Sequence, residues 1–444
     1  IIKRIEDVEK YLESMEQKGY RLEKIKHSYW FYFKESISKQ MCYFLSYKSF
    51  RGSSMGHCDY ALLSKHSANP IKSKLCFYTM YRTKEYKEKG NDLISSFFEF
   101  LRSFTNLSDT FTIFEEKIIL AQGELISTNL FNNYLNEIGK RAVLLPALEF
   151  AKTDKNGEPD TMFIQEELNK KIAENKSAEI FVTQGYICRN FYGEIDNLQR
   201  GGSDYSASLF GAAIKASEIQ IWTDIDGMHN NDPRFVEGTT PIPMLHFEEA
   251  AELAYFGAKI LHPTCILPAK LANIPVRLLN TMQPDAKGTL ISNKSKQGVI
   301  EAVAAKDGIT AIKIKSGRML LAYGFLRKVF EIFESYQTSI DMITTSEVGV
   351  SLTIDNTKHL TEILNDLKKF GTVTIDEDMV IICVVGDLDY SNVGFQAQVL
   401  SAVKDIPVRM VSYGGSNYNI SLLVKKEDKV KALNALSDKL FKQK

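Results

Sequence analysis

The chain has 444 residues, of which 44% are hydrophobic and 25% are charged, which is enough apolar material for two or three domains with their own cores. Its 55 lysines and arginines balance 55 aspartates and glutamates, so no net field favours nucleic acid or an anionic membrane as a partner. The six cysteines are scattered without a C-x-x-C pair or a zinc-type cluster, and no run of about 18 apolar residues occurs. These features predict a cytoplasmic protein with reduced thiols.

Residues 1–80 predict a helix followed by an aromatic hairpin. The segment DVEKYLESMEQKGY (7–20) is a charged helical pattern with a glycine cap, and aromatic residues crowd YWFYFK (29–34) and MCYFLSYKSF (41–50). The segments RGSSMGHCDY and SKHSANPIKSK that follow are rich in turn residues and show no clear period. We therefore do not expect this segment to open an α/β domain.

Residues 81–300 alternate helical patterns with short apolar strands. The strand candidates are AVLLPAL (142–148), EIFVTQGYI (179–187), EIQIWTDIDG (218–227) and IPVRLLN (274–280). Such alternation predicts an α/β domain with a mostly parallel sheet between helices. Ligands of such sheets bind where strands end and helices begin.

An internal repeat occupies the C-terminal part of the chain. The order of features in residues 311–354 recurs in residues 381–424, where Asp341 aligns with Arg409. Each copy has a β-rich run, an amphipathic helix, two alternating strands and a second helix, which is the βαββαβ plan of ferredoxin-like modules. We predict two such α+β modules, 301–378 and 379–444, and a regulatory role, because neither copy contains a catalytic constellation.

The segment NLQRGGSDYS (197–206) lies between a strand and a helical pattern. Glycines let the backbone approach a ligand, and the first turn of the helix attracts an anion. Ser203 and Asp204 are also ordinary helix caps, which is the alternative interpretation. Arg200 favours a ligand, because a guanidinium can hold a carboxylate bidentately, whereas a cap needs none.

Three other segments carry polar residues suited to phosphate and amine ligands. The strand end IWTDIDGMHNNDPR (221–234) contains Thr223, Asp224 and Arg234, although Asn-Asn and Asp-Pro also fill ordinary turns. Lys259 follows a glycine in YFGAKILHPT, where an ammonium group is suited to neutralising a transferring phosphoryl group. Glu124 lies inside the apolar stretch AQGELIS. It is interpreted either as a ligand of the substrate's amino group or as a buried structural acid.

In this order, AQGELIS, TQGYI, RGGSDYSASL, IWTDIDGMHNNDPR, FGAKILHP and ITTSEVGVSLT resemble the aspartokinases of the amino-acid kinase family, particularly the lysine-sensitive monofunctional type, over about 81–444. The resemblance implies an amino-acid-kinase sandwich that lacks its usual first strands, followed by two ACT domains. It implies ATP- and Mg²⁺-dependent phosphorylation of the L-aspartate side chain to 4-phospho-L-aspartate, the first step of lysine, threonine and methionine biosynthesis, with feedback by lysine.

The resemblance also assigns residues and partners. By resemblance, substrate aspartate is bound by Glu124, Arg200, Ser203 and Asp204, and ATP is bound by Thr223, Asp224, Arg234 and Lys259. The chain has His229 at a position where many relatives carry tyrosine. By the same resemblance, the lysine effector is bound by Met319, Phe325, Leu326, Ile340, Asp341, Ser346 and Glu347. No residue is assigned to a protein-bound metal. A homodimer through the ACT domains is expected, with a tetramer as the alternative.

Residues 1–80 depart from the family pattern. Aspartokinases carry a Lys-Phe-Gly-Gly-Thr strand that embraces the phosphoryl group and a Ser-Ala-x-x-Gly-x-Thr-Asn strand end, and neither occurs here. The nearest glycine loop, RGSSMG (51–56), has no lysine, and the segment weakly resembles an uncharacterised small bacterial domain. The alternative hypothesis is a catalytically impaired amino-acid-binding regulatory protein without that phosphate loop.

Overall fold

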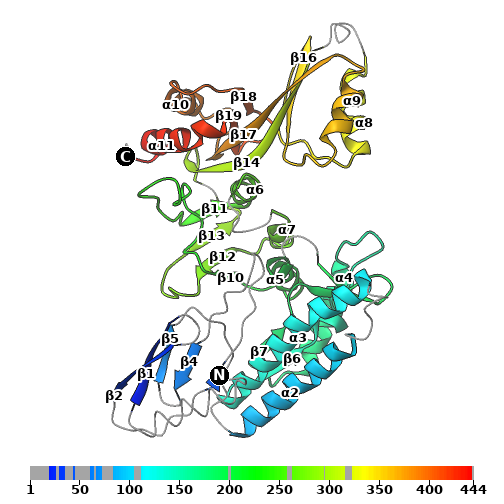
Figure 1. The fold of residues 1–444 in the computed structure, drawn as a ribbon, viewed down its shortest axis with the longest axis vertical. Helices are drawn as coiled ribbons and strands as arrows, with labels where there is room; N and C mark the ends of the chain where they lie inside the picture. The colour runs from blue at the N-terminus through cyan, green and yellow to red at the C-terminus, as the bar shows by residue number, and fades with distance from the viewer. Residues whose placement is uncertain are drawn as a thin grey trace. The chain divides into compact units, whose positions relative to one another are not determined.

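The computed structural model describes residues 20–26, 30–35, 44–45, 61–64, 67–72, 84–104, 112–198, 202–257, 263–294, 296–315 and 323–442. The chain divides into two compact units, Ile1–Asn197 and Leu198–Lys444, and each is treated by itself below, with the labels of Figure 1. None of the described helices is both long and apolar enough to cross a membrane.

The first described part of unit one is all β. Strand β1 (Tyr20–Lys26) pairs antiparallel with β2 (Trp30–Glu35), and β4 (Ala61–Ser64) lies between β3 (Phe44–Leu45) and β5 (Ser67–Lys72). The predicted aromatic strand is present as β2, but its partner is YRLEKIK rather than the second aromatic run, because a short connection favours pairing of consecutive strands. Most of the predicted helix 7–20 lies outside the described residues.

The segment SANPIK forms strand β5, whereas the sequence predicted a turn-rich stretch there. Its Pro70 lacks an N–H group, which tempts a sequence reading toward a turn. Because β5 is an edge strand, it is a position in a sheet where proline is tolerated.

The rest of unit one is α/β. Its elements are α2 (Lys84–Ser103), α3 (Ile113–Glu137), β6 (Ala142–Leu145), η2 (Ala147–Glu149), α4 (Thr161–Glu174), β7 (Ile180–Thr183), β8 (Ile187–Arg189) and β9 (Ile195–Asn197). Strands β6 and β7 are parallel, and β8 and β9 form an antiparallel pair. A capping box between Thr112 and Glu115 begins α3, which packs Leu135 against the two parallel strands.

Unit two begins with a mixed four-stranded sheet and three helices. The elements are α5 (Gly202–Ala213), β10 (Ile219–Thr223), β11 (Met244–His246), α6 (Phe247–Tyr255), α7 (Pro263–Leu271), β12 (Val276–Asn280) and β13 (Thr289–Ser292). The strand order is β10-β12-β13-β11, with β10 and β12 parallel and β12 and β13 antiparallel.

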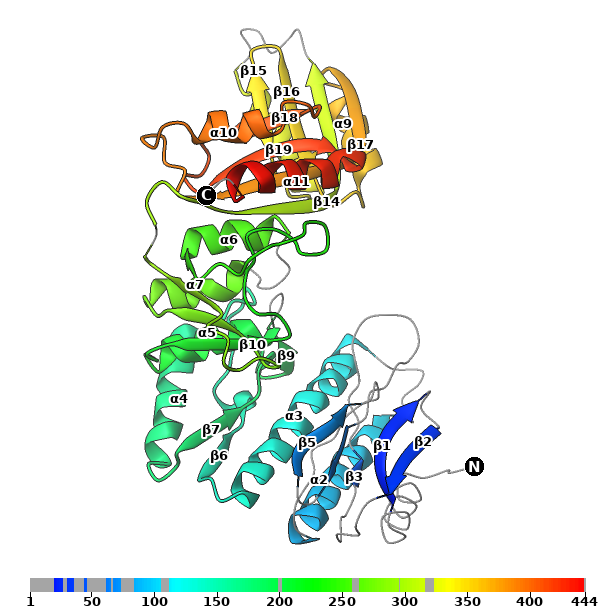
Figure 2. The ribbon, with the colours of Figure 1, turned by 90° about the vertical axis from the view of Figure 1, so that its left-hand side faces the viewer.

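A six-stranded antiparallel sheet with five helical segments completes unit two (Figures 1 and 2). The elements are β14 (Ile300–Lys315), α8 (Phe325–Ser335), β15 (Ile343–Ser346), β16 (Gly349–Ile354), α9 (Leu360–Leu367), β17 (Thr372–Gly386), α10 (Phe395–Ala402), β18 (Met410–Tyr413), β19 (Asn419–Lys425), η3 (Lys426–Asp428) and α11 (Lys429–Leu440). Helices α8 and α9 cover one hydrophobic core, and α10 and α11 cover another.

The two ferredoxin-like modules share their long strands. In the sheet order β15-β16-β14-β17-β19-β18, the second half of β14 and the first half of β17 complete the first module. The second module takes residues 381–386 of β17, and its fourth strand is the start of β14, residues 300–306, from upstream of the first module. The predicted boundary at 378/379 therefore falls within β17, and the exact boundaries of the domains stay a prediction.

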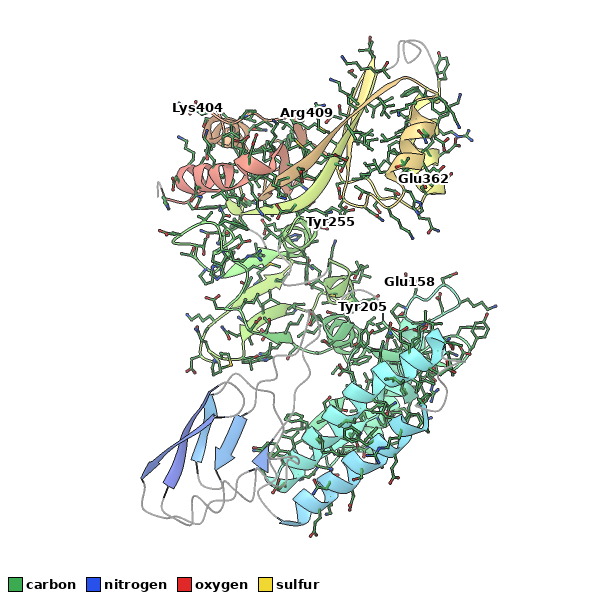
Figure 3. All side chains as sticks on the ribbon, viewed as in Figure 1. Glu158, Tyr205, Tyr255, Glu362, Lys404 and Arg409 are labelled. Carbon is green, nitrogen blue, oxygen red and sulfur yellow. The ribbon has the colours of Figure 1, made fainter. Side chains whose placement is uncertain are left out.

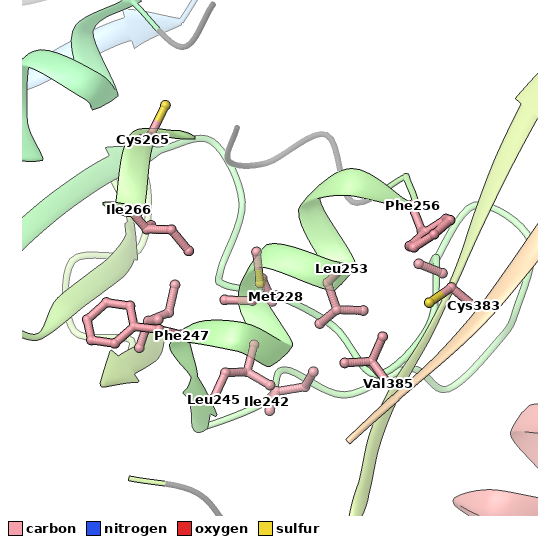
Figure 4. Close-up of a cluster of buried hydrophobic side chains, with 14 of the residues drawn as sticks. Met228, Ile242, Leu245, Phe247, Leu253, Phe256, Cys265, Ile266, Cys383 and Val385 are labelled. Carbon is pink, nitrogen blue, oxygen red and sulfur yellow. The ribbon is translucent and has the colours of Figure 1, made fainter. Parts of the chain in front are cut away.

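A large core joins the two sheets of unit two. Leu253 of α6 and Phe256, which caps its end, lie against Cys383 and Val385 of β17, and all four side chains are nearly inaccessible to solvent (Figure 4). Helix α6 is thus packed directly on the ferredoxin-like sheet through apolar side chains. Burial of this kind stabilises by about 25 cal/mol per Å² of apolar surface, so this contact favours the attachment of α6 to the sheet.

Candidate active site and effector site

Helix α5 carries the described part of the predicted substrate loop. Arg200 lies outside the described residues, whereas Ser203 and Asp204 occupy the first turn, Ser203 exposed and Asp204 half-buried. A Cβ atom on Gly211 would lie 2.5 Å from the side chain of Ile219, so α5 sits directly on strand β10. Ser203 and Asp204 therefore lie at the start of a helix that is packed against the sheet further along its length.

Burial raises the pKa of the Asp204 carboxyl group. Among the described residues, no lysine or arginine forms an ion pair with it. A half-buried carboxylate without a cation is unfavourable for the free protein, and a ligand that carries an ammonium group would offset that cost. This makes Asp204 the best-supported of the described candidate residues.

Glu124 lies half-buried on α3, in unit one. Its backbone carbonyl accepts the hydroxyl of Thr128 at 2.7 Å, and the same hydroxyl accepts the amide of Gln184 at 2.8 Å. Gln184 is fully buried and also accepts the N–H of Ala147 at 2.7 Å. Gln184, in the TQGYI motif, thus links α3 to η2, a contact that the sequence did not predict because the partners are distant in the chain.

Two predicted ATP residues lie together where β10 ends. The hydroxyl of Thr223 donates to the carboxylate of Asp224 at 3.1 Å, and the carbonyl of Thr223 accepts the N–H of Thr281 at 2.8 Å. Asp224 is exposed. Since β10 and β12 are parallel, this strand end is the edge where a nucleotide of an α/β sheet is expected, and both residues fit hydrogen bonds to it.

The loop after β10 holds its polar groups internally. His229 contacts Asp226 at 2.7 Å and Thr239 at 3.0 Å, so both ring nitrogens have partners. Arg234 holds Asp232 with two nitrogens, and Asn231 donates to the carbonyl of Leu433 on α11 at 3.2 Å. The structure thus shows Arg234 as the partner of Asp232 on a loop attached to α11; its role toward ATP stays a prediction.

Lys259 and Met319 lie outside the described residues. Of the other predicted effector residues, Phe325 is buried at the start of α8 and Leu326 is exposed beside it. Ile340 is half-buried, whereas Ser346 and Glu347 are exposed at the turn between β15 and β16.

Asp341 is the exception among these residues, because its side chain is completely buried. One carboxylate oxygen accepts the ammonium of Lys306 at 2.7 Å and the hydroxyl of Tyr255 at 2.9 Å. Burial raises the pKa of Asp341, and the pairing with Lys306 acts against that rise. Neither partner was predicted from the sequence, since Tyr255 and Lys306 lie on elements far from the repeat position of Asp341.

Comparison with known proteins identifies the class. Residues 76–280 match the amino acid kinase family, and residues 382–440 match an ACT domain. The chain is 36% identical to chloroplastic aspartokinase 3 of Arabidopsis thaliana over 74% of this chain, and it spans 62% of that relative's length. It is 35% identical to lysine-sensitive aspartokinase 3 of Escherichia coli, with 73% of this chain and 75% of the relative covered.

The fold agrees with these matches. The crystal structure of E. coli aspartokinase III in complex with aspartate and ADP is similar with a TM-score of 0.68 and 32% identity, covering 81% of this chain and 82% of that chain. An amino-acid-kinase fold followed by ACT domains defines the class of protein. Within that class, the chain belongs to the aspartokinase family.

Proposed function

We propose that this chain transfers the γ-phosphoryl group of ATP to the side-chain carboxylate of L-aspartate, and that lysine inhibits it. A carboxylate oxygen of the substrate attacks the γ-phosphorus, the bond to the β-phosphate oxygen breaks, and ADP leaves with that electron pair. No covalent enzyme intermediate is required, so positioning and charge neutralisation supply the catalysis. The resemblance to a structure determined with aspartate and ADP supports this reaction.

The observation that carries the proposal is the half-buried carboxylate of Asp204 at the start of α5, without a cation partner among the described residues. We assign it to the α-ammonium group of aspartate. Glu124, Arg200 and Ser203 complete the substrate contacts in this proposal, and Thr223, Asp224, Arg234 and Lys259 hold ATP. We expect Mg²⁺ on the phosphates of ATP, where it neutralises charge; the described residues contain no cluster of three metal-binding side chains.

The test traps the product. Purified chain, ATP, Mg²⁺ and aspartate are incubated with hydroxylamine, which converts an acyl phosphate to a coloured hydroxamate, and ADP is measured in parallel. We expect equal amounts of both products, and their loss in Asp204→Asn. The exposed Asp285→Asn is the matched control and should behave as the parent. ADP without hydroxamate would contradict the assignment of aspartate as acceptor.

A second candidate function rests on residues 1–80, which contain no Lys-Phe-Gly-Gly motif. In that case the 444 residues bind amino acid through the ACT domains without rapid phosphoryl transfer. The same assay separates the two functions, because this candidate gives no hydroxamate while lysine still raises the melting temperature by mass action. Lys259→Ala should weaken ATP binding in calorimetry under either candidate.

Lysine as effector and an ACT-mediated homodimer belong to the same proposal. The E. coli relative is named for its lysine sensitivity, and the buried Asp341 supplies a carboxylate for an ammonium group. Sedimentation with and without lysine measures the oligomeric state.

A further inference from the structure

Tyr255, Lys306 and Asp341 form one polar cluster at the point where α6 meets the ferredoxin-like sheet, in which the Asp341 side chain is fully buried and Tyr255 is 41% exposed. Tyr255 is the last residue of α6 and lies beside β14 in Figure 3. Lys306 stands 4.3 Å above the Tyr255 ring, and its ammonium also pairs with Asp355 at 2.9 Å. Asp341 therefore already holds a cation and a hydroxyl, both supplied by the chain itself.

One acceptor of the cluster is left over. Oδ2 of Asp341 is buried and has no hydrogen-bond partner in the described part of the chain. A buried unpaired carboxylate oxygen is unfavourable by about 1–3 kcal/mol, and an incoming ammonium group would satisfy it. Since the side chain is fully covered, such a ligand reaches it only if a covering group moves.

The second ferredoxin-like module shows that the cluster is not a consequence of the fold. Arg409 occupies the position of Asp341: the N–H of Asp341 donates to Thr353 at 2.9 Å, and that of Arg409 donates to Leu423 at 2.7 Å. Ile309 and Met379 occupy equivalent positions and pair with each other in the sheet. Lys306 lies three residues before Ile309 and Asp376 lies three residues before Met379, so Lys306 and Asp376 are equivalent as well. Arg409 pairs with Asp376 at 2.8 Å, so this ion pair has the opposite polarity.

The charge of a third pair of equivalent residues, Asp355 and Lys425, is inverted as well. Asp355 directly follows Ile354 in the first module, and Lys425 directly follows Val424 in the second. The second module has an open cavity of about 840 Å³ bordered by Asp376, Arg409 and Lys425, where the first module has the Tyr255 ring. A cationic ligand fits the first module and is repelled by the guanidinium of the second.

The end of α6 is seated tightly at the same place. A Cβ atom on Gly257 would lie 2.2 Å from the carbonyl oxygen of Ala305, the residue before Lys306. Gly257 precedes Lys259, the predicted phosphate ligand, by two positions in the sequence. Tyr255 is therefore two residues from the point where the chain is held most closely against β14.

We propose that Tyr255 and Lys306 occupy Asp341 as internal substitutes for the cationic effector, and that a bound effector ammonium displaces the hydroxyl of Tyr255 and thereby releases the end of α6. The inference rests on the proposed lysine regulation and adds its mechanism of competition. It assigns Tyr255, a residue of the kinase part, and Lys306 as specificity-determining residues of the effector site.

Isothermal titration of lysine into the full chain tests the competition. Tyr255→Phe keeps the ring over Lys306 and removes only the hydroxyl, so lysine should bind on the order of tenfold more tightly. Lys306→Met keeps the apolar stem and removes the competing cation, so its lysine affinity should also rise. Arg409→Gln breaks the equivalent ion pair of the second module and is the matched control, with unchanged lysine affinity.

Hydrogen exchange provides the second readout. Saturating lysine should increase amide exchange at the end of α6, around Phe256, in the parent, and should have little effect there in Tyr255→Phe, where the bond is already absent. A merely structural tyrosine would give weaker lysine binding, the opposite sign.

The outcomes distinguish the inference from the proposed function. A parent that binds lysine, with both variants binding it equally or more weakly, overturns the competition and leaves lysine regulation standing. A parent that gives neither heat nor a melting shift with lysine overturns lysine as effector and the inference with it. If Lys306→Met fails to fold, Tyr255→Phe decides alone.

Discussion

Replacement of Gly257 by alanine is the sharpest test of how α6 is attached to β14. Gly257 has φ +123°, a conformation that disfavours side chains, and its added Cβ would lie 2.2 Å from the carbonyl oxygen of Ala305. Backbone strain of this kind costs about 1–3 kcal/mol, and forced overpacking costs a similar amount. We expect Gly257→Ala to lose roughly 3 kcal/mol of stability.

In thermal terms, about 1 kcal/mol shifts the melting temperature of a unit of this size by roughly 2–4 °C, so the transition of residues 198–444 should fall by about 6–12 °C. The chain has two tryptophans, so in a Trp30→Phe background the fluorescence of Trp222, on β10 of the same unit, reports that transition alone. Gly123→Ala is the matched control: Gly123 lies within α3 with nothing within 4 Å, so alanine should stabilise by up to about 1 kcal/mol. A Gly257→Ala protein that melts within 1 °C of the parent would refute the close approach.

Three other perturbations have defined outcomes. Burial raises the pKa of Asp204, so its contribution favours folding at low pH and is lost as pH rises through the folded pKa; Asp204→Asn should raise the melting temperature at pH 7 while abolishing aspartate binding by calorimetry. The pKa of Tyr255 is raised to about 12, first by burial and then by Asp341, so its contribution to stability is complete below pH 10 and lost between pH 10 and about 12; alkaline unfolding of Tyr255→Phe should lack this step. Exchange of residues 1–80 for an aspartokinase opening that carries Lys-Phe-Gly-Gly should raise turnover at least a hundredfold, about 2.7 kcal/mol, in the hydroxamate assay; equal turnover would mean that residues 1–80 supply the missing cation.

The fold was predictable where local patterns decide it. Amphipathic helices such as α8, and the repeated order of elements, follow from periodicity alone. The fourth strand of the second module did not follow, because residues 300–306 precede the whole repeat and pair with β17 across about 80 residues. Long-range pairing of this kind leaves no local signature. Strand β5 was missed for another reason, because its segment is rich in turn residues although it pairs with the neighbouring β4.

The candidate site was predictable as motifs and not as contacts. Asp204 and Asp341 were predicted from motif position, and they stay predictions; what makes each informative is burial, which a sequence does not report. Arg234 was predicted to meet phosphate, and the structure shows it holding Asp232 two positions away. Gln184 and Tyr255 were missed because their partners, Ala147 and Asp341, are 37 and 86 residues distant.

The charge inversion between the two modules gives a reason why two copies of one fold would differ in the ligand that they attract. The backbone holds residues 341 and 409 by the same N–H bond, so geometry alone gives the two positions equal access to a ligand. The signs of the three charged side chains then decide, because an ammonium group is attracted by Asp341 and Asp355 and repelled by Arg409 and Lys425. Among the residues that the structure describes, only the first cluster also includes a residue of α6. Both modules contact the kinase part, because Cys383 and Val385 of the second module lie against α6. In our proposal the first module is the sensor because its charged cluster shares a hydrogen bond with Tyr255, through which binding of a cation could alter catalysis.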